Sequence, residues 1–277
     1  MLALRGDRVR MPTEFERIRV TRQGDTALLV LNHPEIVNAI SAKMIGGALL
    51  ALDFVARPDN GFRALVITGE GRGFCSGANL AEGLAEDAAD IPAAIGARLD
   101  KLYHPLLRQL RDLPLPIVTA VNGPAVGIGM SIALMGDIVV AARSAYFLQG
   151  FARIGLVPDG GSTWLLPRLI GLARARELSL LAEKLPAEKA LEWGLINRVF
   201  PDEALLDEAG KLAGKLAEGP TVALAAMRRL YWASPLNSYE QQLDLERQCQ
   251  MEAGGTQDFV EGVSAFLQRR PSGFTGK

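Results

Sequence analysis

Short apolar runs separated by turns dominate the first part of the chain. Residues 14–22 and 26–32 alternate apolar and polar positions on either side of Gly24-Asp25, which predicts a β-hairpin. The runs that follow are rich in Val, Ile and Ala and are bounded by turn residues, as expected for buried strands. These predicted strands cover residues 63–68, 116–121, 137–142 and 146–148.

Between these runs, and in almost all of the chain after them, apolar residues are spaced as in amphipathic helices. Ser41 is the predicted N-cap of a helix that ends near residue 56, and residues 80–96 predict a helical but mobile loop. Other helices are predicted over 97–112, from about Ile128 and from about Gly160. Beyond residue 174 only 196–199 resembles a strand. The helices predicted there cover 174–182, 187–193, 203–217, 221–232, 238–253 and 256–269.

Alternation of strands and helices, followed by helices alone, predicts an α/β core with a helical C-terminal domain. We assign residues 1–200 to the core and residues 201–277 to the helical domain. A length of 277 residues is compatible with this division into one large and one smaller unit.

Composition narrows the class of protein. Hydrophobic residues make up 49% of the chain, enough for a large core, and the formal net charge of -1 gives no basic stripe for nucleic acid. No apolar run reaches the roughly 18 residues of a membrane span, and residues 1–15 lack a signal-peptide core. The two cysteines argue against a disulfide framework. We therefore expect a soluble, cytoplasmic protein without nucleic-acid or membrane partners.

Two predicted strands run directly into a glycine-bearing turn and then a helix. The segments are ALVITGEGRGFCSGANL, residues 64–80, and PIVTAVNGPAVGIGMSIAL, residues 116–134. Glycine lets a ligand approach the backbone closely, and a helix N-terminus presents unpaired N–H groups. Two such turns side by side would aim N–H groups at one developing negative oxygen, which is the arrangement of an oxyanion hole.

Three other interpretations of these glycines stay open at this point. Gly127-x-Gly129 could begin a dinucleotide fingerprint, although Ile132 stands where the third glycine belongs. Cys75 between Gly73 and Gly77 could be a nucleophile, with a base from His33 or His104, the two histidines of the chain. The glycines could also serve only to relieve crowding, with no ligand.

The sequence resembles the enoyl-CoA hydratase/isomerase, or crotonase, superfamily, and its motifs are similar to those of the epoxyphenylacetyl-CoA isomerase branch. The matches span nearly the whole chain in the family's order. They are LNHPEIVNAIS (31–41), GRGFCSGANL (71–80), AVNGPAVGIGMSIAL (120–134), GLVPDGGSTWLLPRLIG (155–171), AEKALEWGLINRVFPDE (187–203) and RRPSGFTGK (269–277).

The resemblance implies a spiral of ββα units, a C-terminal helical domain used in trimerisation, and a homotrimer or dimer of trimers. It implies that the carbonyl of an acyl-CoA thioester lies between the N–H groups of Ala78 and Ile128. CoA is then the only group required besides the acyl chain, and neither a metal nor a separate cofactor is expected. The implied CoA-contacting residues are Val37 and Ala39, Ser76, Asn79 and Leu80, and the tail residues Phe274 and Lys277.

Departures from the family pattern concern the catalytic acids. Hydratases of the family use two glutamates, and the matching positions here are Ser131 and Phe151, which we place at the substrate site. Asp159 matches the catalytic aspartate of several isomerases of the family, and helix capping is its alternative role. Asn79 replaces a usual aspartate. Ile128 replaces a glycine, but it keeps its N–H.

These departures predict an isomerase in which Asp159 takes a proton from one carbon of a thioester enolate and returns it to another. Hydration of an enoyl-CoA remains an alternative, with acids recruited from Glu82, Glu86 or Asp87. Asp159 as a nucleophile on an aryl-CoA is another. A non-catalytic CoA-ester-binding protein is the alternative of a different class. Trp164 and Phe151 hint at a flat substrate, although core packing explains them equally well.

Overall fold

A mixed seven-stranded sheet forms the centre of the molecule. The computed structural model describes residues 13–83 and 90–277. In the sheet β1 (Thr13–Phe15), β2 (Ile18–Gln23) and β3 (Thr26–Leu31) are antiparallel. The strands β4, β5, β7 and β10 continue from β3 in parallel, in the order β1-β2-β3-β4-β5-β7-β10. Their bounds are Ala64–Gly69, Ile117–Val121, Ile138–Ala142 and Arg198–Phe200.

The predicted hairpin is confirmed, but its first strand is divided. A tight turn at Glu16-Arg17 separates β1 from β2, and Arg17 has a left-handed φ of 58°. Apolar and polar residues alternate on both sides of this two-residue turn, which explains why the sequence pattern predicts a single strand. Ser41 caps α1 (Ala42–Ala56) as predicted, since its hydroxyl accepts a hydrogen bond from the Met44 N–H at 3.2 Å.

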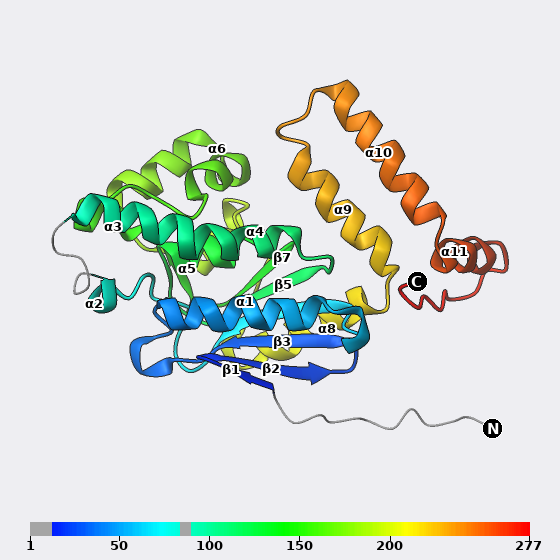
Figure 1. Cartoon of the computed structure of the whole chain (residues 1–277), viewed down its shortest axis with the longest axis horizontal. Coiled ribbons are helices and arrows are strands. Elements are labelled where there is room, and N and C mark those ends of the chain that lie inside the picture. Colours follow the sequence, from blue (N-terminus) through cyan, green and yellow to red (C-terminus); the bar gives the residue numbers. More distant parts are fainter. Residues whose placement is uncertain (1–12, 84–89) are drawn as a thin grey trace.

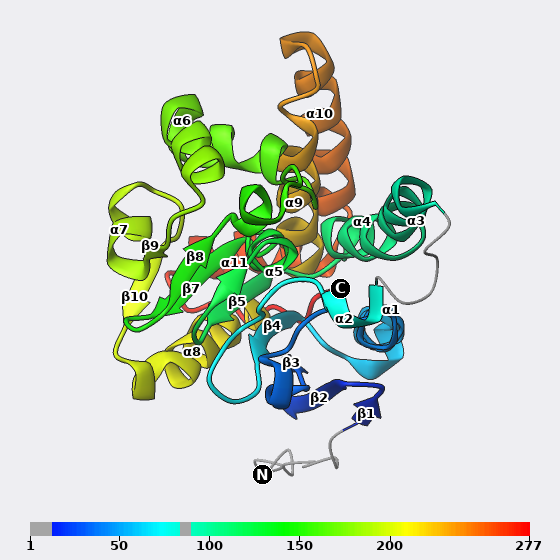
Figure 2. The same ribbon diagram turned by 90° about the vertical axis from the view of Figure 1, so that its left-hand side faces the viewer.

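Both faces of the parallel strands are covered. Every residue of β4 and β5 is buried, which agrees with their unbroken apolar sequences. Helices α1 and α4 (His104–Asp112) lie on one face, and α8 (Leu205–Ala217) lies on the other (Figure 2). Alanines at four-residue spacing in α8 let that helix lie close to the sheet. They are Ala209, Ala213 and Ala217.

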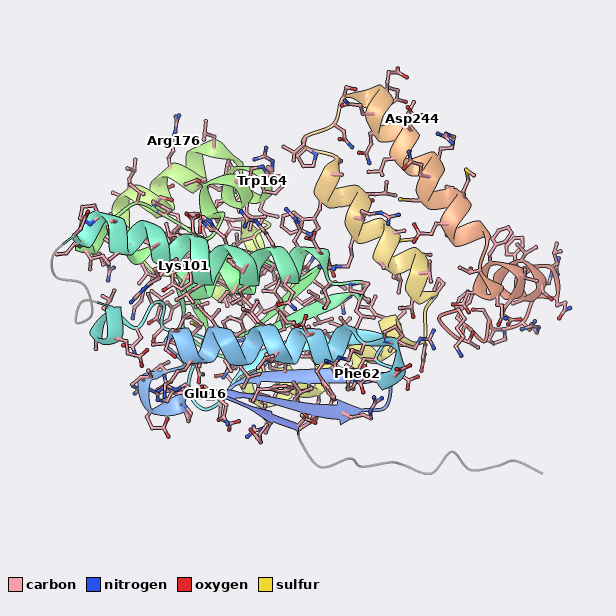
Figure 3. The ribbon with its side chains drawn as sticks, viewed as in Figure 1. Glu16, Phe62, Lys101, Trp164, Arg176 and Asp244 are labelled. Carbon is pink, nitrogen blue, oxygen red and sulfur yellow. The ribbon has the colours of Figure 1, made fainter. Side chains whose placement is uncertain are left out.

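The helix predicted over 97–112 is longer and is interrupted. It begins as α3 (Ile91–Arg98), passes through a π-helical turn at Leu99–Tyr103, and continues as α4. In Figure 3, Lys101 marks this turn in the middle of the long helical arm. Single π turns inside α-helices are frequent at functional sites, and they leave no mark on apolar periodicity. Of the loop predicted over 80–96, the structure describes α2 (Leu80–Gly83) and residues 90–96, which include the start of α3.

A second, small sheet lies beside the first. It consists of β6 (Ala125–Val126), β8 (Tyr146–Leu148) and β9 (Leu185–Pro186), in the order β6-β8-β9. Of these strands the sequence predicts only β8, because two-residue strands carry no period. Helix α5 (Ile128–Ala133) follows β6, and α6 (Ser162–Leu181) and α7 (Ala187–Glu192) flank β9. The two helices predicted near 160 and 174 are both present within α6, on either side of a kink at Gly171, where φ and ψ are not helical.

The helices α9 (Thr221–Ala233), α10 (Tyr239–Gly254) and α11 (Gln257–Leu267) extend away from the sheet, at the side opposite α2 (Figure 1). The helix α11 lies within its predicted range, and α9 and α10 each end one residue beyond theirs. The boundary at residue 200 stays a prediction, and α8 packs against β4 and β5 of the core. No helix within residues 13–83 and 90–277 is both long enough and apolar enough to cross a bilayer.

An ion pair between the buried Arg228 and the partly exposed Asp137 attaches α9 to the core. Arg228 donates from Nε to both carboxylate oxygens of Asp137, at 2.8 and 2.6 Å, and from its Nη atoms to the carbonyls of Leu110 and Leu113. Asp137 also accepts a hydrogen bond from the Ile117 N–H at 2.7 Å. Burial raises the pKa of Asp137, and the charge of Arg228 opposes that shift. The guanidinium thereby links α9, the end of α4 and the start of β5.

Candidate active site

The first glycine-bearing turn follows β4 and runs alongside the turn at residues 33–40. The N–H of Ser76 donates to the Val37 carbonyl at 2.9 Å, and the N–H of Asn79 donates to the Ile40 carbonyl at 2.8 Å. The Ser76 hydroxyl donates to the carbonyl of Ile36 at 3.0 Å. The two segments that the resemblance assigns to CoA are therefore neighbours in space.

The 33–40 turn contains two consecutive residues in the left-handed region. Val37 has φ of 53° and Asn38 has φ of 55°, which is uncommon for residues with a Cβ. The fully buried Asn38 amide stabilises this conformation. It accepts from the His33 N–H at 2.8 Å and donates to the carbonyls of Glu70 and Gly73 at 2.9 and 2.8 Å. Strained backbone held by such bonds is concentrated at ligand sites.

The second turn follows β5 and leads into α5, which begins at Ile128. Gly127 precedes it with φ of 53° and ψ of -123°, and no side chain caps the helix. A residue with a Cβ would be strained in this conformation. The absence of a capping side chain leaves the N–H groups of the first turn of α5 available to a ligand.

Contacts between the two turns lock them together. Cys75 and Ala125 form a parallel bridge, and the Val126 N–H donates to the Cys75 carbonyl at 2.9 Å. A Cβ on Gly129 would lie 2.6 Å from the Cys75 Sγ, so α5 rests directly on the first turn. Glycine thus relieves crowding here, as one interpretation expects, but in doing so it brings the two turns into contact.

The N–H groups of Ala78 and Ile128 are both unused. Within residues 13–83 and 90–277, neither donates to a backbone or side-chain acceptor. Buried backbone N–H groups are nearly always paired in folded proteins, and Ile128 is 2% exposed. Two free donors on adjoining turns meet the first requirement of an oxyanion hole. Their role toward a substrate stays a prediction.

Asp159 lies in the loop that precedes α6. Gly160 and Gly161 follow it with φ of 61° and 78°, and the half-buried carboxyl has an Oδ1 without a hydrogen-bond partner among the described residues. Burial raises the pKa of Asp159 to about 6, and the nearby His104 opposes this shift. No side chain caps α6, whose N-cap is Gly161. The structure therefore does not support helix capping as the role of this carboxylate.

Neither position at which hydratases of the family carry a catalytic glutamate holds an acid here, and both side chains are packed against neighbouring groups. Ser131 is fully buried, and its hydroxyl lies 3.2 Å from the Asp159 carbonyl and 2.7 Å from the Ser162 Oγ. The ring of Phe151 lies 3.4 Å from the place of a Cβ on Gly127. Phe151 thereby forms an apolar wall beside the start of α5, as the sequence indicates.

Two residues that the sequence did not select as site residues lie near Asp159. Tyr103 is 4% exposed. Burial raises the pKa of its phenol, Asp159 raises it further, and Arg98 lowers it. His104 lines a cavity of about 370 Å³ together with Gly160, Gly161, Trp164 and Trp232, so it faces the Asp159 loop. Tyr103 and His104 lie at the end of the π-helical turn, which places both of them near Asp159. No sequence signal reveals that turn.

The sequence reasoning treated His104 as a packed or surface residue. In the structure its imidazole is partly exposed, and its Nδ1 lies 3.2 Å from the carboxylate of Asp100. Within the described residues, no group of three or more His, Cys, Asp or Glu side chains is arranged to hold a metal ion.

Cys75 has the environment of a structural cysteine. It is fully buried, and burial raises the pKa of its thiol to about 12. A nucleophilic cysteine requires the thiolate, which such a pKa disfavours at neutral pH. Its Sγ lies 3.9 Å from the Gly77 carbonyl, and both histidines contact other groups, Glu35 for His33 and Asp100 for His104. The structure argues against Cys75 as a nucleophile.

The tail residues are bound to their own chain, at the other side of the molecule from α2 (Figure 1). The Asp258 carboxylate accepts from the N–H groups of Thr275 and Gly276 at 2.7 and 2.8 Å. Arg63 donates to the Phe274 carbonyl at 3.0 Å. One chain therefore does not bring Phe274 and Lys277 to the Ala78 turn, and their implied contact with a neighbouring subunit stays a prediction.

The acids proposed for hydration are placed only in part. Glu82 in α2 has a side chain that is 42% exposed, and it forms an ion pair with Arg17 at 3.3 Å. Glu86 and Asp87 lie outside the described residues. Leu80, at the start of α2, is 47% exposed, and Asn79 is partly buried beside it.

Known proteins share this sequence and fold. The family described as Enoyl-CoA hydratase/isomerase matches residues 21–277. A 1,2-epoxyphenylacetyl-CoA isomerase from Escherichia coli (strain K12) is 46% identical over 90% of this chain and 94% of its own length. A probable enoyl-CoA hydratase from Rhodobacter capsulatus is 43% identical, over 95% of this chain and 99% of its own length.

Among solved structures, a putative enoyl-CoA hydratase from Streptomyces coelicolor A3(2) superposes with a TM-score of 0.88. It is 30% identical, and the match covers 100% of both chains. The sheet, the flanking helices and the helical C-terminal region are therefore those of the crotonase fold. This chain belongs to the enoyl-CoA hydratase/isomerase family.

Proposed function

We propose that the protein is an acyl-CoA isomerase that moves a proton between two carbons of the acyl group. The observation that carries the proposal is a single carboxylate, Asp159, in a site whose other two acid positions hold Ser131 and Phe151. The N–H groups of Ala78 and Ile128 bind the thioester oxygen. Coenzyme A is part of the substrate, and no other cofactor is required.

The reaction follows from this arrangement. The Asp159 carboxylate accepts a proton from a carbon of the acyl group, and the C–H electron pair becomes part of an enolate. The two N–H groups stabilise the negative charge that develops on the thioester oxygen. The protonated Asp159 then returns the proton to a different carbon. One carboxylate suffices, because the proton that is removed is the proton that is given back.

An aromatic or otherwise flat acyl group is the proposed substrate class. Five residues after Asp159, the ring of Trp164 stacks on Trp232 of α9 with centroids 5.6 Å apart. Figure 3 shows Trp164 at the end of α6 that lies nearest to α9. The two rings line the cavity of about 370 Å³ behind Gly160. The similarity to an epoxyphenylacetyl-CoA isomerase supports the same class.

The role of Asp159 is tested by Asp159→Asn. The amide cannot accept the proton, so we expect turnover of a responsive acyl-CoA to fall at least about 1,000-fold, since loss of an acid–base group costs about that much. Asp244→Asn is the control, because Asp244 lies on α10, away from the sheet (Figure 3). It should retain full activity, and both variants should bind a CoA ester measured by calorimetry. Full activity of Asp159→Asn would exclude the proposed role.

Hydration is the second candidate, favoured by the similarity to the probable hydratase from Rhodobacter capsulatus. Loss of the enoyl absorbance of crotonyl-CoA distinguishes the two reactions. Rapid hydration by the wild-type protein would favour this candidate over isomerisation. Binding of straight-chain, dienoyl and arylacetyl CoA esters without turnover of any of them would instead favour a non-catalytic binding protein.

We also propose that the protein is cytoplasmic and assembles as a homotrimer or a dimer of trimers. The last two helices carry large apolar side chains that one chain leaves exposed, and this supports assembly. They are Tyr239, Met251, Phe259, Val260, Phe266 and Leu267, between 54% and 83% exposed.

A further inference from the structure

Three buried polar residues connect Asp159 to the helix that carries Ile128. Gln149, Ser162 and Ser131 are each fully buried. The Gln149 Nε2 lies 3.2 Å from the Ser162 Oγ, the Ser162 Oγ lies 2.7 Å from the Ser131 Oγ, and the Ser131 Oγ lies 3.2 Å from the Asp159 carbonyl. None of the three takes part in the proton transfer described above, so their burial needs another reason.

The number of hydroxyl protons determines which group donates in each of these hydrogen bonds. A serine hydroxyl has one proton to donate. Ser131 uses its proton toward a carbonyl, that of Asp159 at 3.2 Å or that of Gly127 at 3.4 Å, so Ser162 must donate to Ser131. Ser162 is then left to accept from the Gln149 amide. The chain runs from Gln149 through Ser162 and Ser131 to the backbone at Asp159.

The Asp159 loop is also pressed against Ser131. A Cβ on Gly160 would lie 2.5 Å from the Ile128 Cδ1 and 2.8 Å from both Cβ and Oγ of Ser131. There is consequently no room at position 131 for a longer side chain while Gly160 keeps its place. A glutamate at this position would have to displace the loop that carries Asp159.

We infer that Gln149, Ser162 and Ser131 form a one-way hydrogen-bond chain, which positions Asp159 against the oxyanion turn and fills the place of a second acid. They are positioning residues. The inference about reaction choice rests on the proposed isomerase function: with this place filled, a proton can be shuttled, but no second carboxylate is present to activate water.

Among the described residues, the titratable groups near Asp159 come from one side only. His104 and Tyr103 face it from the helical arm, with Arg98 close to Tyr103 and Asp100 beside His104. On the side of α5 and α6 its neighbours Ser131 and Ser162 are neutral. Loss of a neutral hydroxyl therefore leaves every charge unchanged. A change in Asp159 ionisation would then report a change in its solvation.

The test measures Asp159 ionisation without turnover. Protein labelled with ¹³C in the aspartate carboxyl is titrated by infrared spectroscopy, and Asp159→Asn identifies the signal. Ser131→Ala and Ser162→Ala free the loop, so solvent reaches the carboxyl and its pKa falls from about 6 toward its ordinary value. Thr119→Val is the control, because Thr119 is fully buried and carries a neutral hydroxyl as the two serines do, but it lies in β5 and outside the hydrogen-bond chain.

We expect the midpoint to fall by about one pH unit in Ser131→Ala, less in Ser162→Ala, and not in Thr119→Val. In the isomerase assay kcat should fall about fivefold in Ser131→Ala with little change in KM, the loss of about one neutral hydrogen bond. Circular dichroism shows which variants fold, and Ser162→Ala carries the test if Ser131→Ala does not. Unchanged midpoints in both serine variants would overturn the inference.

Ser131→Glu tests the filled position. We expect it to lose isomerisation and gain no hydration of crotonyl-CoA, because the new side chain displaces Gly160. Retained isomerisation together with new hydration would overturn the inference. Failure of the proposed function has a different result: a wild-type protein that isomerises no CoA ester. The infrared midpoints would still decide whether the hydrogen-bond chain positions Asp159.

Discussion

The carboxyl group of Asp159 is half-buried, and its Oδ1 receives no hydrogen bond from the described residues. Burial without such bonds favours the neutral acid, which is why its pKa is raised to about 6. A base with this pKa is mostly ionised at neutral pH and still accepts a proton readily. The same environment that makes Asp159 a suitable base also makes its charge unfavourable to the fold.

Activity and stability should therefore change with pH in opposite directions. The proposed isomerisation needs the Asp159 carboxylate, so kcat/KM should rise through a midpoint near pH 6. The folded state holds the proton more tightly than the unfolded chain, whose carboxyl has a pKa of about 3.9. Between these values the folded state binds more protons, so the free energy of unfolding falls as pH rises.

Urea denaturation of Asp159→Asn checks the sign of this effect. At pH 7.5 the variant should be more stable than wild type by about 1 to 3 kcal/mol, the range left after the partial exposure of the carboxyl is taken into account. Near pH 3 the difference should vanish, because the pH is then below both pKa values and the wild-type carboxyl is mostly protonated in both states. A wild-type protein that is the more stable of the two at pH 7.5 would contradict this account.

At the scale of elements, the sequence predicts the helices and strands that are long enough to show a periodic pattern of apolar residues. The hairpin, α1 and its cap at Ser41, and α9 to α11 lie where their patterns place them. The π-helical turn at Leu99–Tyr103 keeps helical spacing on both sides, so its effect on Tyr103 and His104 is invisible in sequence. The strands β6 and β9, two residues each, are too short for any period.

Some residues of the candidate site could likewise be predicted from the sequence, and others could not. Backbone at glycine-bearing turns and Asp159 could be found from local sequence, because turn residues and the family motifs mark them. The partners of Ser131 could not, since Gln149 and Ser162 join it only through tertiary packing. The predicted roles of Phe274 and Lys277 depend on a second chain, which a single sequence does not position.

The attachment of α9 to the core is a testable property of this element. Arg228→Ala should lower the free energy of unfolding by about 2 to 3 kcal/mol, because it removes the hydrogen bonds of a buried guanidinium to two backbone carbonyls and to the partly exposed Asp137. Arg229→Ala is the matched control on the same helix. Its ion pair with Glu252 is half-exposed, and its loss should cost at most about 1 kcal/mol. Equal losses in urea denaturation would argue against the anchoring role.

For the whole molecule, the exposed apolar side chains of α11 bear on assembly. Phe266→Asp should shift the protein from the proposed trimer or hexamer to smaller species in size-exclusion chromatography with light scattering, because a charge would be buried at the proposed interface. Leu50→Asp on α1 serves as the control, since Leu50 is also exposed, at 61%, but lies on a different helix. Dissociation by the Leu50 variant alone would place the interface elsewhere.

The contact between Gly129 and Cys75 limits how this enzyme can be changed. With a Cβ excluded at 2.6 Å from the sulfur, the two turns that carry Ala78 and Ile128 behave as one rigid body. A rigid pair of donors cannot adapt its spacing to a new acyl group. Laboratory evolution toward other thioesters should therefore leave these turns untouched and collect substitutions around the Trp164–Trp232 cavity, the proposed acyl site, which side chains line.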